Sequence, residues 1–98
     1  MRTLEEVKAE LETLKPILKK RFKVETIDIF GSYARNQANE KSDIDLLVTY
    51  STTDYDYFTI IGLKKYLRRK LGVKVDVVSK EFLNRHIKDE LLKEAIPV

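Results

Sequence analysis

The segment from Phe30 to Val48 constrains the fold more than any other part of the chain. A hydrophobic run ends abruptly at Gly31-Ser32, and glycine permits the backbone conformations that a tight strand-to-helix turn needs. Ser32 is suited to open a short helix, whose free N–H groups and dipole attract an anion such as phosphate. The segment therefore predicts a strand, a sharp turn and a helix start that can hold a phosphate group.

Two aspartates open the apolar strand that follows this turn. Asp43 and Asp45 are two residues apart, so in a strand their side chains point to the same face, about 7 Å apart along the chain. The apolar run after them indicates a strand that is buried on both faces. Two like charges at the mouth of such a strand repel each other and resist desolvation unless a cation compensates them. A phosphate-holding turn followed by two cation-binding carboxylates favours a site for a nucleoside triphosphate.

These two segments together resemble a known signature. Gly31-Ser32-Tyr33-Ala34-Arg35, followed by Ser42-Asp43-Ile44-Asp45-Leu46-Leu47-Val48, is similar to the motif of the polymerase-beta-like nucleotidyltransferase superfamily. The family pattern often has Gly where this chain has Asn36, and Asn tolerates left-handed backbone angles, so we expect the loop to form. The length of 98 residues and the end soon after a fourth helix resemble the minimal nucleotidyltransferases. Those proteins are commonly encoded beside a HEPN-type ribonuclease toxin and act as its antitoxin.

The resemblance implies a set of site residues. In the superfamily a third carboxylate on a later strand completes a metal triad, and Asp76 takes that role by resemblance. Taken alone, Asp76 in its valine-rich strand is better explained as a charge that protects a sheet edge. The implied catalytic and metal-binding residues are Asp43, Asp45 and Asp76, and the implied nucleotide-binding residues are Gly31, Ser32, Arg35 and Ser42.

The resemblance also implies a reaction. In it, Asp43 and Asp45 bind two Mg²⁺ ions, for which Mn²⁺ can substitute, and the Gly31-Ser32 turn helps to orient the triphosphate of ATP. One ion, shared with Asp76, lowers the pKa of an acceptor hydroxyl, which attacks the α-phosphorus while pyrophosphate leaves. Asp76 could also take the hydroxyl proton as a general base.

The implied acceptor is a protein. Larger relatives carry an extra domain that grips a small-molecule, tRNA or DNA acceptor, and nothing in these 98 residues resembles that domain. The resemblance therefore implies AMP transfer from ATP to a hydroxyl of a HEPN-type toxin, with no nucleic acid as the direct acceptor. The alternative is a non-catalytic nucleotide-binding protein that neutralises a toxin by contact alone. The intact Asp43, Asp45 and Asp76 favour the enzyme.

The hydrophobic periodicity predicts a two-layer α/β (α+β) fold, with helices packed on a small mixed sheet of three strands, in one domain of residues 1–98. The predicted helices are 3–21, 32–36, one that ends at Gly72 and one capped by Ser79, and the predicted strands are 24–30, 43–50 and 73–78. Pro16 should kink or split the first helix, which Thr3 caps. A three-stranded sheet is barely self-sufficient, so its edges could be covered by a partner or by another copy of the chain in a homo-oligomer.

The composition indicates a chain without disulfides or a membrane span. There is no cysteine, which fits a reducing compartment, and no apolar run near the ~20 residues that cross a bilayer, so we expect the protein in the cytoplasm. The net charge is +3, and the densest basic run consists of Lys64, Lys65, Arg68, Arg69 and Lys70. We favour the solvated face of an amphipathic helix for this run over a surface for nucleic acid, and it would also suit an acidic partner.

Other side chains of the motif region have two interpretations. Arg35 suits a phosphate contact and a surface salt bridge equally well. Tyr33, Tyr55 and Tyr57 could stack on a nucleotide base, although packing is the simpler role for each. His86 lies away from the motif and is predicted to be a neutral histidine of the last helix.

Overall fold

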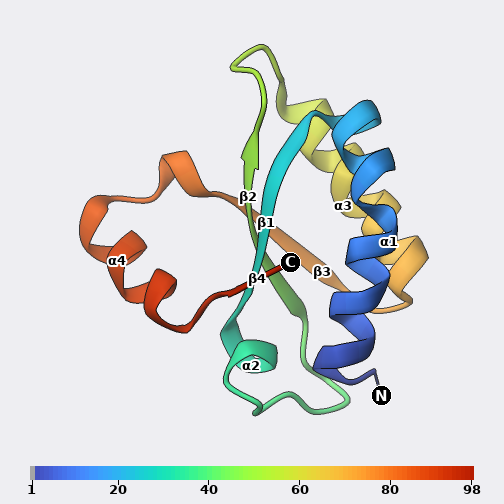
Figure 1. The fold of residues 1–98 in the computed structure, drawn as a ribbon, viewed down its shortest axis with the longest axis vertical. Coiled ribbons are helices and arrows are strands. Elements are labelled where there is room, and N and C mark those ends of the chain that lie inside the picture. Colours follow the sequence, from blue (N-terminus) through green and yellow to red (C-terminus); the bar gives the residue numbers. More distant parts are fainter. Residues whose placement is uncertain (1) are drawn as a thin grey trace.

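The computed structural model describes residues 2–98 and packs helices on a mixed sheet (Figure 1). In chain order the elements are α1 (Leu4–Phe22), β1 (Val24–Phe30), α2 (Gly31–Ala34), β2 (Ile44–Tyr50), α3 (Tyr57–Leu71), β3 (Val75–Ser79), a 3-10 helix (Lys80–Phe82), α4 (Arg85–Glu94) and β4 (Ile96–Pro97). The predicted fold class is confirmed. No helix of residues 2–98 is long and apolar enough to cross a membrane.

The sheet has four strands in the order β3-β2-β1-β4, one more than predicted. The fourth strand is Ile96–Pro97, which pairs antiparallel with Asp28 and Ile29 of β1. Two residues are too few to show a strand periodicity, and their pairing with β1 is a long-range contact that the local sequence does not indicate. A proline is tolerated there because β4 is an edge strand.

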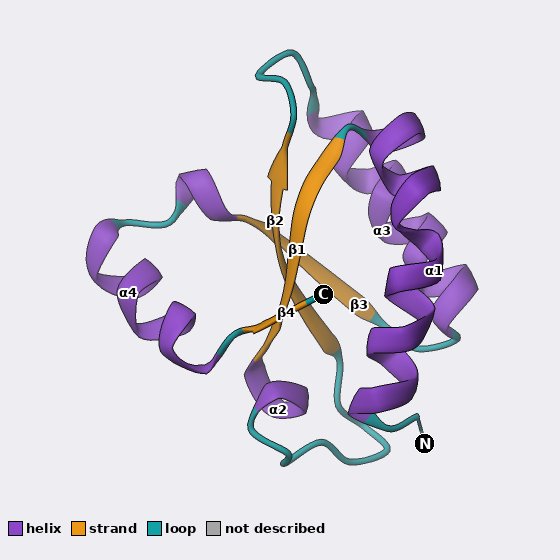
Figure 2. Cartoon of the chain, in the orientation of Figure 1, coloured by secondary structure: helices purple, strands orange, loops and turns teal. Residues whose placement is uncertain are grey.

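The directions of the strands bring three strand ends to one end of the sheet. β2 runs antiparallel to β1 and parallel to β3, and α3 makes the crossover between the two parallel strands (Figure 2). The end of β1, the start of β2 and the start of β3 therefore lie together, with α2 beside them (Figure 1).

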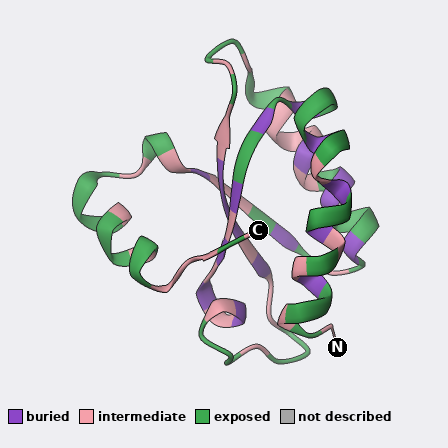
Figure 3. Ribbon diagram, viewed as in Figure 1, coloured by how far each residue is buried: buried purple, intermediate pink, exposed green. Residues whose placement is uncertain are grey.

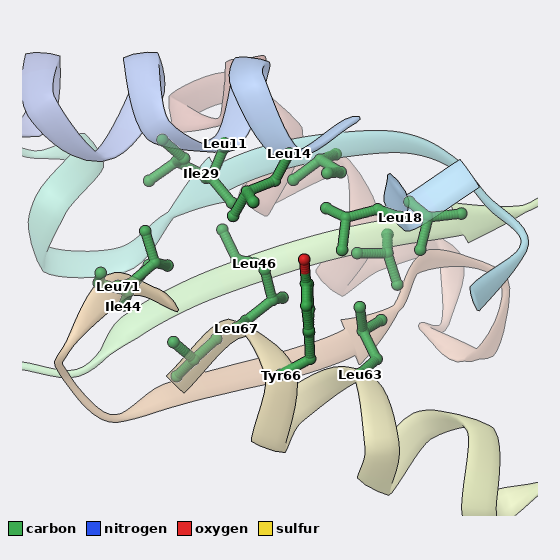
Figure 4. Packing of buried hydrophobic residues seen from close by; sticks show 14 of the residues in the cluster. Leu11, Leu14, Leu18, Ile29, Ile44, Leu46, Leu63, Tyr66, Leu67 and Leu71 are labelled. Carbon is green, nitrogen blue, oxygen red and sulfur yellow. The ribbon is translucent and has the colours of Figure 1, made fainter. Parts of the chain in front are cut away.

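The hydrophobic core lies between the sheet and the pair α1 and α3 (Figure 4). From the helices it contains Val7, Leu11, Leu14, Leu18, Phe22, Leu63, Tyr66, Leu67 and Leu71, and from the strands Val24, Ile27, Ile29, Ile44, Leu46, Val48 and Val75. These strand residues alternate with those that point to the opposite face, among them Asp28, Asp45 and Asp76. The core therefore fixes which side chains the sheet turns away from α1 and α3.

Helix α1 is continuous from Leu4 to Phe22, so of the two predicted effects of Pro16, a kink or a split, the split is wrong. Proline removes one N–H from the helix ladder, and the carbonyl that loses its donor belongs to Glu12. Both residues are exposed, so water can satisfy that carbonyl, while the leucine stripe on the other side of α1 stays packed. At its start the predicted capping box is present, with Thr3 and Glu6 bonded reciprocally.

The last helix begins later than predicted. Ser79 does not cap it, because the pairing of β3 with β2 continues to Ser79, which lies opposite Val48 and is buried. Asn84 is the N-cap of α4, and its Oδ1 accepts a hydrogen bond from Ile87 N at 2.9 Å. No residue of α4 is fully buried, as Figure 3 shows. The predicted stop of α3 at Gly72 is confirmed, with a left-handed backbone.

We expect Thr3→Ala to lower the free energy of unfolding by about 1 kcal/mol, because it removes one half of the capping box of α1. Thr13→Ala is the matched control in the same helix. Thr13 is exposed and only bonds back to the carbonyl of Ala9, so its replacement should leave stability unchanged or raise it by roughly 0.5 kcal/mol. Urea titration of the two variants measures the difference, and equal midpoints would contradict the role of the cap.

Candidate active site

Strand register places two of the candidate carboxylates on neighbouring strands. Asp45 lies opposite Phe30 of β1 on one side and opposite Asp76 of β3 on the other. Neighbouring strands are about 4.8 Å apart, so the side chains of Asp45 and Asp76 leave the same sheet face next to each other. Asp43 precedes Asp45 by two residues at the mouth of β2. Gly31, which follows Phe30 directly, is thereby brought against Asp45.

Gly31 is required at this place for two reasons. Its φ of +73° lies in the left-handed region that residues with a side chain rarely adopt. A Cβ at Gly31 would also overlap Oδ2 of Asp45 and lie 3.1 Å from its Cγ. The turn from β1 into α2 therefore exists only with glycine in contact with the Asp45 carboxylate.

The short helix after the turn begins at Gly31, so Ser32 lies in its first turn and does not precede it. At the end of this helix, Arg35 N donates a backbone hydrogen bond to Gly31 O at 3.1 Å, and Gln37 N donates one to Ser32 O at 2.8 Å. Asn36 has a φ of +58° and adopts the left-handed conformation that was expected of it. The loop therefore forms with asparagine in the position where the family pattern often has glycine.

Asp43 and Asp76 are each paired with a lysine. Lys74 Nζ lies 3.8 Å from Asp43 Oδ2, and Lys64 Nζ of α3 lies 3.4 Å from Asp76 Oδ1. Asp45 has no ion pair among residues 2–98. Burial raises the pKa of Asp45, and the neighbouring Asp76 and Asp43 raise it further, while Arg35 opposes them. Asp45 is therefore the point at which negative charge is least compensated.

The two ion pairs each hold a carboxylate beside a lysine. Within residues 2–98, no three His, Cys, Asp or Glu side chains are close enough together to enclose a metal ion. Asp43 pairs with Lys74 and Asp76 with Lys64, and both carboxylates line the same hollow at the start of β3. The donor set still suits a hard divalent cation, because all three groups are carboxylates and Asp45 lacks a counter-ion. Binding one ion through all three requires these half-exposed pairs to open.

The other predicted site residues lie around this centre with different roles in the structure. Arg35 makes an ion pair of 3.0 Å with Glu94 of α4, which is the surface salt bridge of its two predicted roles. Ser42 accepts a hydrogen bond from Asn39 N at 2.8 Å and donates its own N–H to Asn39 O at 3.0 Å. Ser42 thereby closes the loop that leads directly into Asp43.

The remaining candidates are not brought to the carboxylates. Tyr33 is buried in the core, and Tyr55 stacks on Tyr50 at the far end of β2. Tyr57 is exposed at the start of α3, and His86 is exposed on α4. Packing is thus the role that the structure shows for Tyr33 and Tyr55.

Two functional candidates were not singled out as site residues from the sequence, Lys64 and Lys74. With Lys65 and Arg68 they line a hollow of about 390 Å³ that reaches Asp43 and Asp76. The only sequence signal was the basic run of α3, which contains Lys64. Such a run faces a site only when the crossover helix packs on the sheet in a suitable orientation. The local sequence does not show that orientation.

Comparison with known proteins decides the family of the chain. The family model described as nucleotidyltransferase domain matches residues 11–98. The chain belongs to this nucleotidyltransferase family. It is therefore an enzyme of nucleotidyl transfer, as the motif implied.

Full-length relatives agree with this assignment. The nucleotidyltransferase is 46% identical over 99 residues to MJ0128 of Methanocaldococcus jannaschii, which is provisionally named a protein adenylyltransferase, and the match covers 100% of both chains. It is 40% identical over 98 residues to the protein adenylyltransferase MntA of Thermococcus cleftensis, covering 100% of this chain and 98% of the relative.

Solved structures show the same fold. One provisionally described as a minimal nucleotidyltransferase superposes with a TM-score of 0.84 at 35% identity, covering 99% of this nucleotidyltransferase and 97% of that chain. A crystal structure of a toxin–antitoxin with AMP-PNP superposes with a TM-score of 0.73 at 25% identity, covering 90% and 70%. The resemblance to minimal nucleotidyltransferases is confirmed.

We expect Gly31→Ala to weaken the affinity of this nucleotidyltransferase for ATP in the presence of Mg²⁺, because the new Cβ would displace the Asp45 carboxylate. Gly72→Ala is the matched control. Gly72 has a nearly identical φ of +72°, but a Cβ there would meet nothing within 4 Å. Both variants should lose about 1 kcal/mol of stability from the left-handed backbone, and only Gly31→Ala should lose affinity in calorimetric titration. Unchanged affinity in Gly31→Ala would contradict the role of the turn.

The raised pKa of Asp45 gives a pH-dependent prediction for the protein in EDTA. The pKa of Asp45 is higher in the folded protein than in the unfolded chain. Protonation of Asp45 therefore stabilises the fold, and this contribution is fully present when the pH is below the unfolded pKa. It is lost as the pH rises through the folded pKa. Asp45→Asn removes the unfavourable charge, so it should raise the urea midpoint at neutral pH. The gain should shrink as the pH falls toward about 4.

Asp54→Asn is the control for this pH series, because Asp54 is exposed in the loop before α3 and the change in net charge is the same. Its urea midpoint should stay at that of the wild type at both pH values. A gain in Asp45→Asn that is equal at neutral and acidic pH would show that the ionised carboxylate is not its source.

Proposed function

We propose that this nucleotidyltransferase transfers AMP from ATP to a hydroxyl group of a partner protein, and that the partner is a HEPN-type toxin which the transfer neutralises. The register that sets Asp45 beside Asp76, with Gly31 against Asp45, carries the catalytic part of the proposal. Two full-length relatives are named as protein adenylyltransferases, one of them provisionally, which supports AMP and a protein acceptor. The related toxin–antitoxin structure with AMP-PNP supports ATP and a toxin as the two substrates.

The reaction is a displacement at the α-phosphorus of ATP. An acceptor hydroxyl oxygen forms the new bond to this phosphorus, the bond to the oxygen bridging the α- and β-phosphates breaks, and pyrophosphate leaves with the electron pair. The hydroxyl proton goes to Asp76, which is the most exposed of the three carboxylates and lies at the sheet edge. Mg²⁺ ions held by Asp43, Asp45 and Asp76, or Mn²⁺ in their place, would neutralise phosphate charge and acidify the hydroxyl.

The chain itself positions the triphosphate. The bare backbone of Gly31 lets a phosphate approach the first turn of α2, where the hydroxyl of Ser32 is partly exposed. Arg35 can add a guanidinium contact once it leaves Glu94. Ser42 holds the loop before Asp43, so that the carboxylate enters β2 at a fixed place. In this proposal the donor phosphates lie on the β1 side of Asp45, against Gly31 and Ser32.

The partner supplies the acceptor, and the proposed setting is the cytoplasm, where a ribonuclease toxin meets its RNA. Large apolar side chains on the surface of the nucleotidyltransferase offer contact area for a partner. They include Phe58 of α3 at 77% exposure, Phe82 of the 3-10 helix at 73% and Ile87 of α4 at 47%. Inhibition through such contacts alone is the competing explanation, and it needs no chemistry at the carboxylates.

We expect ATP with Mg²⁺ to raise the melting temperature of the wild type, and ATP with EDTA to raise it less. The double variant Asp43→Asn with Asp45→Asn should lose the Mg²⁺-dependent part of this rise in melting temperature, because both proposed metal ligands become neutral. Asp54→Asn with Asp89→Asn changes two exposed aspartates and should keep the full shift. Equal Mg²⁺-dependent shifts in the two double variants, measured by differential scanning fluorimetry, would contradict the assignment of the pair.

The transfer itself is tested on the proposed partner, a HEPN-type toxin. After incubation with wild type, ATP and Mg²⁺, the intact mass of that protein should rise by one or more AMP units and its ribonuclease activity should fall. Asp76→Asn should slow the transfer by about 100-fold or more while ATP still binds, because Asp76 acts at the acceptor hydroxyl. Full neutralisation by Asp76→Asn, with no AMP on the partner of the wild type, would establish inhibition by contact.

A further inference from the structure

A basic groove continues from the carboxylates along the outer edge of the sheet. The hollow of about 390 Å³ that reaches Asp43 and Asp76 adjoins a second hollow of about 470 Å³. Lys65, Arg68 and Lys74 line both hollows, so they form one groove between α3 and the start of β3. We call this surface the basic groove. Each of its two parts falls within the size range of small-ligand sites.

Two of the three cations that line both hollows have no counter-ion among residues 2–98. Lys64 and Lys74 are paired with Asp76 and Asp43, whereas Lys65 and Arg68 make no ion pair with any residue of the range 2–98. Lys65 and Arg68 are exposed and three residues apart on α3, so they project from the same helix face. A solvated helix face is normally convex, but here these cations line a concavity beside the proposed catalytic carboxylates. The groove therefore suits an anion that approaches the carboxylates from this side.

The basic groove lies on the acceptor side of the site. Gly31 and the proposed phosphate position follow β1, on one flank of Asp45. Asp76 and the groove lie on the opposite flank, at the β3 edge of the sheet. With the donor triphosphate at Gly31, an anion in the groove would belong to the molecule that is being modified.

The product of the proposed transfer has the chemistry that this position requires. An acceptor that has received AMP carries a phosphodiester, which is an anion, and a ribose with free hydroxyls, which are acceptors of the same class as the first hydroxyl. The first hollow also contains the apolar side chains of Ile61 and Val75, against which a base or ribose can pack. The guanidinium of Arg68 and the ammonium group of Lys65 line the same hollow and match the negative charge of a phosphodiester.

We propose that the basic groove binds the phosphodiester of an AMP unit already attached to the acceptor and presents its ribose hydroxyl for the next transfer. This inference rests on the proposed function. A solved structure of the same fold holds a tri-AMPylated HEPN toxin of Shewanella oneidensis in complex with an MNT antitoxin, so the new element here is the groove and the residues that hold the attached unit. In each further step the ribose oxygen bonds to the α-phosphorus of another ATP, pyrophosphate leaves, and the proton goes to Asp76. Lys65 and Arg68 hold the preceding phosphodiester, and the second hollow receives the unit before it. The groove therefore controls how many AMP units are added.

The variant for the test is Lys65→Ala with Arg68→Ala, which keeps good helix formers in α3 and leaves Lys64 and Lys74 on their carboxylates. The matched control is Lys19→Ala with Lys20→Ala, two exposed cations at the end of α1 with the same change in net charge. Each protein is incubated with the HEPN-type partner of the proposed function, ATP and Mg²⁺. The number of AMP units is then followed with time by intact mass.

The expected result is a series of AMP additions for wild type and control, and for Lys65→Ala with Arg68→Ala a normal first addition with later ones slowed about tenfold. An unchanged series in this variant overturns the inference. So does an equal slowing of the first addition, because the groove would then serve ATP or the unmodified acceptor. A single addition by the wild type also overturns the inference but leaves the proposed function standing. No addition at all overturns the proposed function itself.

A binding measurement tests the groove without catalysis. A fluorescent 5′-phosphorylated adenosine trinucleotide should bind the wild type and the Lys19→Ala, Lys20→Ala control equally well. Its binding to Lys65→Ala with Arg68→Ala should be about tenfold weaker. A hexaglutamate peptide that binds the groove as tightly as the trinucleotide would assign the surface to an acidic protein segment and overturn the inference.

Discussion

The parallel register of β2 and β3 is the constraint on which the rest of the site depends. It holds Asp45 next to Asp76, while the antiparallel register with β1 holds Gly31 against Asp45. Strand spacing is fixed by backbone hydrogen bonds, so the backbone positions of Asp45 and Asp76 cannot move apart without breaking the ladder. The core under α1 and α3 therefore maintains a cluster of like charges that is unfavourable by itself. A bound cation removes that repulsion, which links the stability of the fold to the proposed chemistry.

Lys64 and Lys74 are the internal counter-ions of this cluster. Each pair is half exposed, and such pairs contribute little to stability, so a divalent cation can replace the lysine without a large loss. The displaced ammonium groups would then join Lys65 and Arg68 along the groove. Occupation of the carboxylates by a cation would thus increase the positive charge on the acceptor side at the moment when an anionic acceptor has to be held.

The motif allowed the turn and the first two carboxylates to be predicted, because their geometry is local. Gly31 indicated a tight strand-to-helix turn, and the spacing of Asp43 and Asp45 indicated a common face. Non-local features escaped prediction. Ser79 and Asn84 are both good N-caps, and only the pairing of Ser79 with β2 decides between them. The strand β4 is too short for a periodic pattern, and the reach of Lys64 to Asp76 depends on how α3 crosses over the sheet.

The central claim is that three carboxylates and the Gly31 turn form one site for a cation and the phosphates of ATP. A crystal structure of the protein grown with Mn²⁺ and AMP-PNP, with anomalous data for manganese, tests it most directly. We predict manganese density at Asp43 and Asp45, phosphate density at Gly31, and Lys64 and Lys74 turned away from the carboxylates. AMP-PNP bound with its phosphates away from Gly31, or without manganese at these aspartates, would contradict the account.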